Sequence, residues 1–240
     1  MRPPAIERMG YYPTDEPVVE IIRTYLKPPS ERGRLFDPCA GEGKAASSLG
    51  NALNCETWGV ELSPERAGKA QNVMDKVFQA PWQACVLSDE SISWLYLNPP
   101  YDFDRFEGQK RLEWDFLKTT SSKLMRGGLL TYIIPQKILG MIEVARLLAG
   151  HYEAITVYRF PDGLYEKFKQ VVVLAYKRKL YQLPTDKEIL SLQSLASTEL
   201  EPIHSAVEPI YELLPAPLRG ANGKPVMFKR TDWEPEEVVE

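Results

Sequence analysis

Short apolar runs alternate with helix-compatible segments along the first 180 residues, and this alternation limits the possible folds more than any other feature of the chain. Strand-like runs lie near Leu35, Trp58, Val77 and Leu95, with helical patterns between them. Strands that alternate with helices build a parallel sheet covered by helices on both faces. The sequence therefore predicts an α/β fold with a doubly wound, mainly parallel sheet.

The segments after residue 110 extend the same pattern. Helices are expected over residues 112–125 and 138–148, and strands over residues 129–134, 154–158 and 170–176. No full helix separates the last two strands, so they are expected to form a terminal antiparallel hairpin.

A glycine turn joins the first strand to its helix. Gly41 and Gly43, in the sequence DPCAGEG (residues 37–43), allow the backbone to turn tightly and to approach a ligand closely. About 20 residues further on, Glu61 ends the next strand, where a carboxylate can accept both hydroxyls of a ribose. The glycines do not match the dinucleotide motif G-x-G-x-x-G, because Ala46 stands at the third position. The pattern indicates a nucleoside site of another kind.

A second motif, Asn98-Pro99-Pro100-Tyr101, directly follows the apolar run at residues 92–97. The amide oxygen of Asn98 and the carbonyl of Pro99 can each accept one hydrogen of an amino group, while Tyr101 stacks on its plane. A strand that simply ends in a Pro-Pro turn is the alternative interpretation. The motif predicts a site for a planar group that carries an amine.

Together these motifs resemble the class I S-adenosylmethionine-dependent methyltransferases, in particular the amino-methyltransferases with an N-P-P-Y motif. Residues 10–17 (GYYPTDEP) are similar to the Y-P-T-P element of gamma-type N6-adenine DNA methylases, and the resemblance covers roughly residues 10–180. It implies a seven-stranded sheet and S-adenosylmethionine as cofactor. It assigns catalysis to Asn98, Pro99, Pro100 and Tyr101. It assigns the cofactor to Tyr12, Pro13, Thr14, Asp37, Pro38, Cys39, Ala40, Gly41, Gly43, Glu61, Leu62, Gln79 and Asn98.

The resemblance favours methylation of adenine N6 in DNA. Methylation of a protein glutamine at N5 would place a similar amino group in the same pocket, but glutamine methylases generally have an N-terminal helical domain, and only 34 residues precede Leu35 here. The motifs are also compatible with methylation of an RNA amino group and with a non-catalytic module that binds partners.

Residues 181–240 differ from the preceding methyltransferase domain (residues 1–180). They contain 7 of the 20 prolines, with a helical pattern at residues 187–195 and a possible strand at residues 225–229. An extended arm packed on the core is expected, and removing it is expected to leave a folded core. Residues 234–240 resemble a first helical turn without a stop signal, which is compatible with a longer protein that continues beyond Glu240.

Charge is unevenly distributed. Residues 181–240 hold 11 of the 33 acidic and 5 of the 29 basic residues, which leaves 22 acidic and 24 basic residues in the first 180. Binding to DNA depends on basic side chains, so this chain alone is expected to bind duplex DNA weakly. Target recognition is then expected to need a partner subunit or a further C-terminal region.

The sequence contains no apolar run of membrane-spanning length and no signal peptide, so a cytoplasmic protein is expected. Cys39, Cys55 and Cys85 form no C-x-x-C pair, and the chain has only two histidines. Reduced thiols and no metal site are therefore expected.

Overall fold

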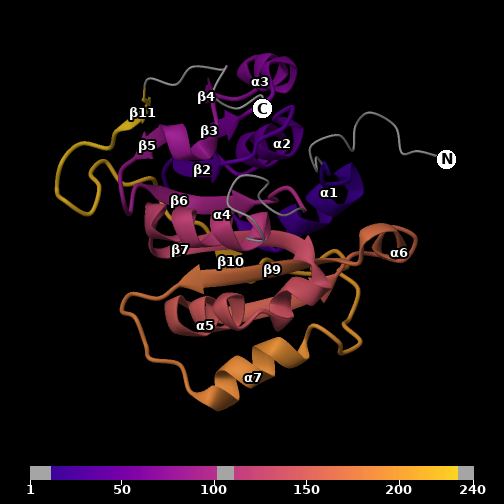
Figure 1. Ribbon diagram of the computed structural model, residues 1–240. Coiled ribbons are helices and arrows are strands. Elements are labelled where there is room, and N and C mark those ends of the chain that lie inside the picture. Colours follow the sequence, from indigo (N-terminus) through magenta and orange to yellow (C-terminus); the bar gives the residue numbers. More distant parts are fainter. Residues whose placement is uncertain (1–11, 102–110, 232–240) are drawn as a thin grey trace.

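A seven-stranded central sheet organises the molecule (Figure 1) in the computed structural model, which describes residues 12–101 and 111–231. Within this sheet, as far as the structure describes it, only β9 (Gln170–Lys177) runs antiparallel to its neighbours, and it lies between β7 (Leu124–Pro135) and β8 (Tyr152–Arg159). This order confirms the predicted α/β fold with a mainly parallel sheet and a reversed strand near one edge. In spatial order the strands are β4 (Lys76–Gln79), β3 (Cys55–Glu61), β2 (Gly33–Asp37), β6 (Ile92–Leu97), β7 (Leu124–Pro135), β9 (Gln170–Lys177) and β8 (Tyr152–Arg159).

Helices cover both faces of the sheet because successive strand residues point to opposite sides. Phe36 packs in the cluster that includes α4 and α5, whereas its neighbour Leu35 packs in the cluster that includes α1, α2 and α3. The described helices are α1 (Glu16–Thr24), α2 (Lys44–Ala52), α3 (Pro64–Gln71), α4 (Leu112–Thr120), α5 (Ile142–His151), α6 (Tyr165–Phe168) and α7 (Asp186–Ser194).

Two helix boundaries differ from the sequence prediction. The helix expected over residues 112–125 ends at Thr120, and β7 already begins at Leu124, which pairs with Ile92. The two glycines at 127 and 128 therefore lie inside a strand and do not stop a helix. The helix expected over residues 138–148 is a 3₁₀ segment, η4 (Gln136–Gly140), followed by α5. The spacing of apolar residues does not reveal where a helix ends and a paired strand begins.

The arm from residue 181 onward is built into both hydrophobic clusters. Strand β10 (Tyr211–Glu212) pairs with β1 (Leu26–Lys27), and β11 (Phe228–Arg230) pairs with β5 (Cys85–Leu87). Tyr211 is buried in the cluster of α1, and Phe228 is buried in the cluster of α4 and α5. Helix α7 packs beside α5, at the end of the molecule opposite α3 (Figure 1). Burial of these two side chains argues against the expectation that the core folds without the arm, which stays untested.

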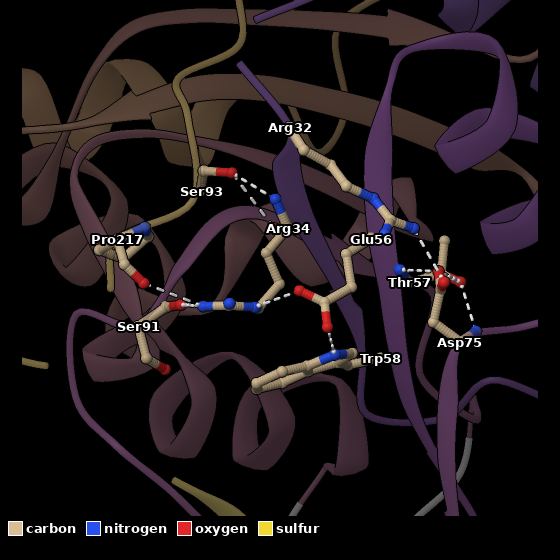
Figure 2. Close-up of polar contacts among 9 residues, drawn as sticks. All are labelled: Arg32, Arg34, Glu56, Thr57, Trp58, Asp75, Ser91, Ser93 and Pro217. Atoms are coloured by element: carbon tan, nitrogen blue, oxygen red, sulfur yellow. Dashed lines mark hydrogen bonds and ion pairs between the residues drawn. The ribbon is translucent and has the colours of Figure 1, made fainter. Parts of the chain in front are cut away.

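A polar cluster around Arg34 connects part of this arm to strand β2 (Figure 2). The guanidinium of Arg34 donates to Glu56 Oε2 at 3.0 Å and to the carbonyls of Ser91 and Pro217 at 2.8 and 3.2 Å. It also lies 4.2 Å from the ring centre of Trp58. Its partners Glu56, Ser91 and Pro217 come from three separate parts of the chain. Pro217 belongs to the arm, so this buried cation connects the arm to the core.

Candidate active site

A cavity of about 800 Å³ opens at the carboxyl ends of the parallel strands. That is where open α/β sheets bind their ligands, and the volume lies within the roughly 300–1,000 Å³ of small-molecule sites. The structure brings seven of the predicted cofactor residues together on its lining, namely Tyr12, Pro13, Thr14, Asp37, Cys39, Ala40 and Asn98.

The other predicted cofactor residues lie away from this lining. Gln79, at the end of β4, lines a separate opening with Lys229 and Arg230, and its carbonyl accepts from Arg230 at 3.2 Å. Gln79 is therefore not part of the cavity lining, and its contact with the cofactor stays a prediction. The predicted residues outside the lining are Pro38, Gly41, Gly43, Glu61, Leu62 and Gln79.

The glycine turn has the geometry that the sequence suggested. Gly43 precedes α2 with φ +77°, and a Cβ there would lie 3.0 Å from Met74 Sδ and 3.1 Å from Ala70 Cα. Gly41 has φ +57°, also in the left-handed region. Both glycines therefore shape the loop and set the start of α2, although neither lines the cavity.

Glu61 holds the glycine turn in place. Its Oε2 accepts from the Gly41 amide at 2.8 Å, while Oε1 accepts from the Ser63 amide at 2.8 Å and from Arg66 Nη2 at 2.7 Å. The residue is only 4% exposed. A carboxylate oxygen has two lone pairs, so Oε2 retains one for a ribose hydroxyl while these bonds persist. The ribose contact remains a prediction, and Arg66 is a neighbour that the sequence reasoning did not consider.

Asp37 ends β2 and lies on the cavity lining. Its Oδ1 accepts from the Cys39 amide at 2.9 Å, and burial of the carboxyl raises the pKa of Asp37 to about 7. A cationic ligand nearby would favour the ionised form. The Cys39 thiol donates to the Asn98 carbonyl at 3.2 Å, which links the glycine turn to the N-P-P-Y segment.

Further charged groups from α2 and α3 complete the cavity. Glu42 pairs with Lys44 and with Lys69, each at 2.8 Å, and these bonds lower the pKa of Glu42 to about 2. The first turn of α2 also faces the cavity, and amide groups at a helix N-terminus attract anions. A ligand that carries both a carboxylate and a cation fits this lining. The lining residues that sequence reasoning missed are Glu16, Val19, Glu42, Lys44, Ala45, Ser48, Glu65, Arg66 and Tyr96.

Asn98 connects the catalytic segment to the early Tyr-Pro-Thr element. Its Nδ2 donates to the Tyr12 carbonyl at 2.7 Å and to Thr14 Oγ1 at 3.1 Å. Its Oδ1 accepts from the Tyr101 hydroxyl at 2.8 Å. Two motifs more than 80 residues apart in sequence thus meet at the cavity, and Pro99 is buried behind them while Pro100 is half-buried.

Tyr101 lies in an aromatic cluster beside Asn98. Its ring stacks on Tyr12, with the ring centres 5.0 Å apart and the planes inclined by 11°. The Tyr101 hydroxyl accepts from Gln170 Nε2 at 2.7 Å, and Tyr12 also contacts Phe168, with ring centres 4.6 Å apart. Burial raises the pKa of Tyr101, so its hydroxyl stays protonated. Gln170 reaches this site because β9 is reversed, in agreement with the expected terminal hairpin, but no local sequence signal indicated its contact with Tyr101.

The loop at residues 102–108, which mixes aromatic and charged residues after the N-P-P-Y motif and is a candidate to line the target pocket, lies outside the described residues. Within residues 12–101 and 111–231, no cluster of three or more His, Cys, Asp or Glu side chains is arranged to hold a metal ion. No helix in the same ranges is long and apolar enough to cross a membrane. The cysteines are free, and Cys55 is buried while Cys39 and Cys85 are half-buried.

Residues 5–215 match the sequence family described as the uncharacterised methyltransferase family DUF6094. The chain belongs to this family. No curated protein matches the DUF6094 chain in sequence.

Several solved structures share the fold of this DUF6094 protein. A putative methyltransferase from Haloferax volcanii, in complex with the Trm112 methyltransferase activator, is 11% identical with a TM-score of 0.51, over 74% of this chain and 93% of that one. TYW2 from M. jannaschii, in complex with S-adenosylmethionine, is 15% identical with a TM-score of 0.51, over 73% and 80%. A methyltransferase from Pyrococcus furiosus is 15% identical with a TM-score of 0.50, over 72% and 91%.

The family and the shared fold agree with the methyltransferase expected from the sequence. S-adenosylmethionine as the expected cofactor agrees with the family and with the neighbour that holds it. Membership of this family makes methyl transfer the chemistry expected of the chain.

Proposed function

We propose that this protein transfers a methyl group from S-adenosylmethionine to an exocyclic amine, with adenine N6 in DNA as the favoured acceptor. The observation that carries the proposal is the position of Asn98 and Tyr101. Asn98 lines the large cavity at the carboxyl ends of the strands, and Tyr101 is bonded to it at 2.8 Å. A cofactor in the cavity and an acceptor against Tyr101 would then meet at Asn98.

The cavity has the chemistry to hold this cofactor. S-adenosylmethionine carries a sulfonium, an ammonium and a carboxylate group, and the lining offers the Asp37 carboxyl and the first turn of α2. We assign the cationic groups to the side of Asp37 and the carboxylate to the amides that begin α2. Glu61 fixes the glycine turn and offers its remaining Oε2 lone pair to the ribose.

When bound, S-adenosylmethionine supplies an electrophilic methyl group. An exocyclic amine is a weak nucleophile because its lone pair is delocalised into the ring. Asn98 Oδ1 and the Pro99 carbonyl accept the two amine hydrogens, which favours a pyramidal nitrogen and stabilises the positive charge that develops there. With the cofactor bound, the nitrogen would take the methyl group, S-adenosylhomocysteine would be the leaving group, and the nitrogen would lose one proton to solvent. Orientation of two bound reactants contributes roughly 7–11 kcal/mol to such reactions.

DNA is favoured because Thr14, from the element that resembles the gamma-type adenine methylases, lies 3.1 Å from Asn98. The net charge of −4 argues for weak DNA binding by this chain alone, and we propose that a partner subunit or a further C-terminal region recognises the target. One structural neighbour was solved with an activator protein, which is a precedent within this fold for such a partner. We also retain residues 1–180 as the methyltransferase domain and residues 181–240 as its arm.

An acceptor panel tests the proposal. DNA, RNA and cell-extract protein are incubated with the full chain and methyl-labelled cofactor, and the products are identified by mass spectrometry. N6-methyladenine in DNA is expected, and Asn98→Ala is expected to lower the rate of its formation by about 10²–10³-fold. Asn222→Ala, in the exposed turn where Asn222 accepts from the Lys224 amide, is the matched control. N5-methylglutamine or a methylated RNA base as the sole product would replace the DNA assignment.

A further inference from the structure

Three aromatic rings stand in a row beside the cavity, and Tyr12 is the middle one. Its ring stacks on Tyr101, with ring centres 5.0 Å apart, and also contacts Phe168, with ring centres 4.6 Å apart and planes inclined by 58°. Phe168 is 38% exposed, so the row reaches the protein surface. A planar side chain of the protein itself thus lies against the tyrosine of the N-P-P-Y motif.

The place of the Tyr12 ring meets three conditions that an acceptor ring must meet. Tyr12, which carries the ring, is part of the cavity lining. It is next to Asn98, whose Nδ2 donates to the Tyr12 carbonyl at 2.7 Å. It is stacked on Tyr101 with an inclination of only 11°. An acceptor that receives a methyl group from the cavity and presents its amine to Asn98 needs this same place.

We propose that Tyr12 is a specificity-determining residue whose ring fills the acceptor position until a planar acceptor replaces it. The inference rests on the proposed function, since it takes Asn98 and Tyr101 as the acceptor site. Asn98 holds the backbone carbonyl of Tyr12, so the exchange needs rotation of the Tyr12 side chain and leaves the backbone bond intact.

This exchange selects for the shape of the acceptor. Removing the Tyr12 ring from the row breaks two ring contacts, and an acceptor with its own ring restores them between Tyr101 and Phe168. A flexible amide side chain, such as that of glutamine, offers no ring and leaves both aromatic faces uncovered. Tyr12 therefore favours nucleobases over protein amides at this site.

Binding of a short single-stranded DNA distinguishes a Tyr12 ring that the acceptor displaces from a Tyr12 ring that stays in place. The probes are a fluorescein-labelled single-stranded oligodeoxyadenylate and the same strand with abasic sites, measured by fluorescence anisotropy at saturating S-adenosylhomocysteine. Tyr12→Ala should bind the oligodeoxyadenylate about 5- to 160-fold more tightly than the wild type, since it no longer loses two aromatic pairs on binding. Tyr12→Phe, which keeps the ring, should match the wild type. Tyr181→Ala, a ring on the arm that packs against His151, is the control.

The abasic strand should show no gain with Tyr12→Ala, because it brings no ring to the vacated place. An equal gain for both strands, an unchanged affinity (including no measurable binding by either protein) or weaker binding by Tyr12→Ala would each overturn the inference. Asn98→Ala in the methyl-transfer assay keeps the two proposals apart. If that variant remains active, the proposed function fails; if it is inactive while Tyr12→Ala shows no gain, only the inference about Tyr12 fails.

Discussion

Strand β2 carries a buried ionisable side chain near each end, and the surroundings of these two side chains differ. Arg34, near its start, is surrounded by Glu56, two carbonyls and the face of Trp58 (Figure 2). Asp37, at its end, borders the cavity, and burial raises the pKa of its carboxyl to about 7. A cation surrounded by acceptors contributes to stability, whereas a carboxyl held near neutrality responds to a ligand. The same strand thus serves the fold at one end and the site at the other.

Removing residues 181–240, which include the Arg34 partner Pro217, is expected to have the largest effect on stability. Tyr211 and Phe228 are 2% and 5% exposed, and each belongs to a different hydrophobic cluster. We expect the shortened chain to lose cooperative thermal unfolding by circular dichroism, because both clusters would open to water. Leu218→Ala, at a side chain that is 85% exposed, should leave the melting curve unchanged. A shortened chain with the same melting curve as the full chain would show that the arm does not contribute to the stability of the core.

Arg34→Ala tests the polar cluster with less disturbance. Loss of one partner of a buried pair costs about 3–5 kcal/mol, and the lower value is expected here because the Glu56 side chain is 27% exposed. Arg32→Ala, two residues earlier, removes an exposed pair with Asp75 and should cost at most about 1 kcal/mol. Urea unfolding of the two variants measures the difference. Equal losses would mean that burial does not distinguish these two arginines.

Asn98→Ala tests the cavity that Asp37 and Asn98 both line. We expect methyl transfer to fall by about 10²–10³-fold, as when one preorganised hydrogen-bonding group is removed from an active site. Unfolding in urea should change little, since Asn98 is half-buried and Tyr101 can still bond to Gln170. Single-turnover assays at saturating cofactor measure the effect. Transfer near the wild-type rate would remove Asn98 from the mechanism.

The raised pKa of Asp37 predicts how cofactor binding depends on pH. The ionised carboxylate attracts the cationic groups of S-adenosylmethionine, so calorimetry should show affinity rising about tenfold between pH 6 and pH 8. Asp37→Asn should flatten this dependence. Without ligand the sign is opposite: the folded protein binds the proton more tightly than the unfolded chain, so this carboxyl lowers the unfolding free energy as pH rises from about 4 to 7. A pH-independent affinity in the wild type would exclude Asp37 as a cation contact.

Local patterns were sufficient for much of the fold and part of the site. The period of apolar residues located the central strands, and the glycine turn and the N-P-P-Y motif were placed at the carboxyl ends of parallel strands, where they indeed meet. The helix end at Thr120 and the strand start at Leu124 were missed, because strand pairing with Ile92 takes precedence over helical spacing.

Only the tertiary structure decided which side chains meet. The reversed strand β9 brings Gln170 to Tyr101 across 69 residues, and the row of rings places Tyr12 against the same tyrosine. Gln79 lines a separate opening, and α3 gives Glu61 a partner in Arg66. Periodicity and motifs are properties of neighbouring residues, so the sequence alone determined the elements and their chemistry. Partners far apart in the chain depend on packing directions and strand order, which exist only once the sheet has formed.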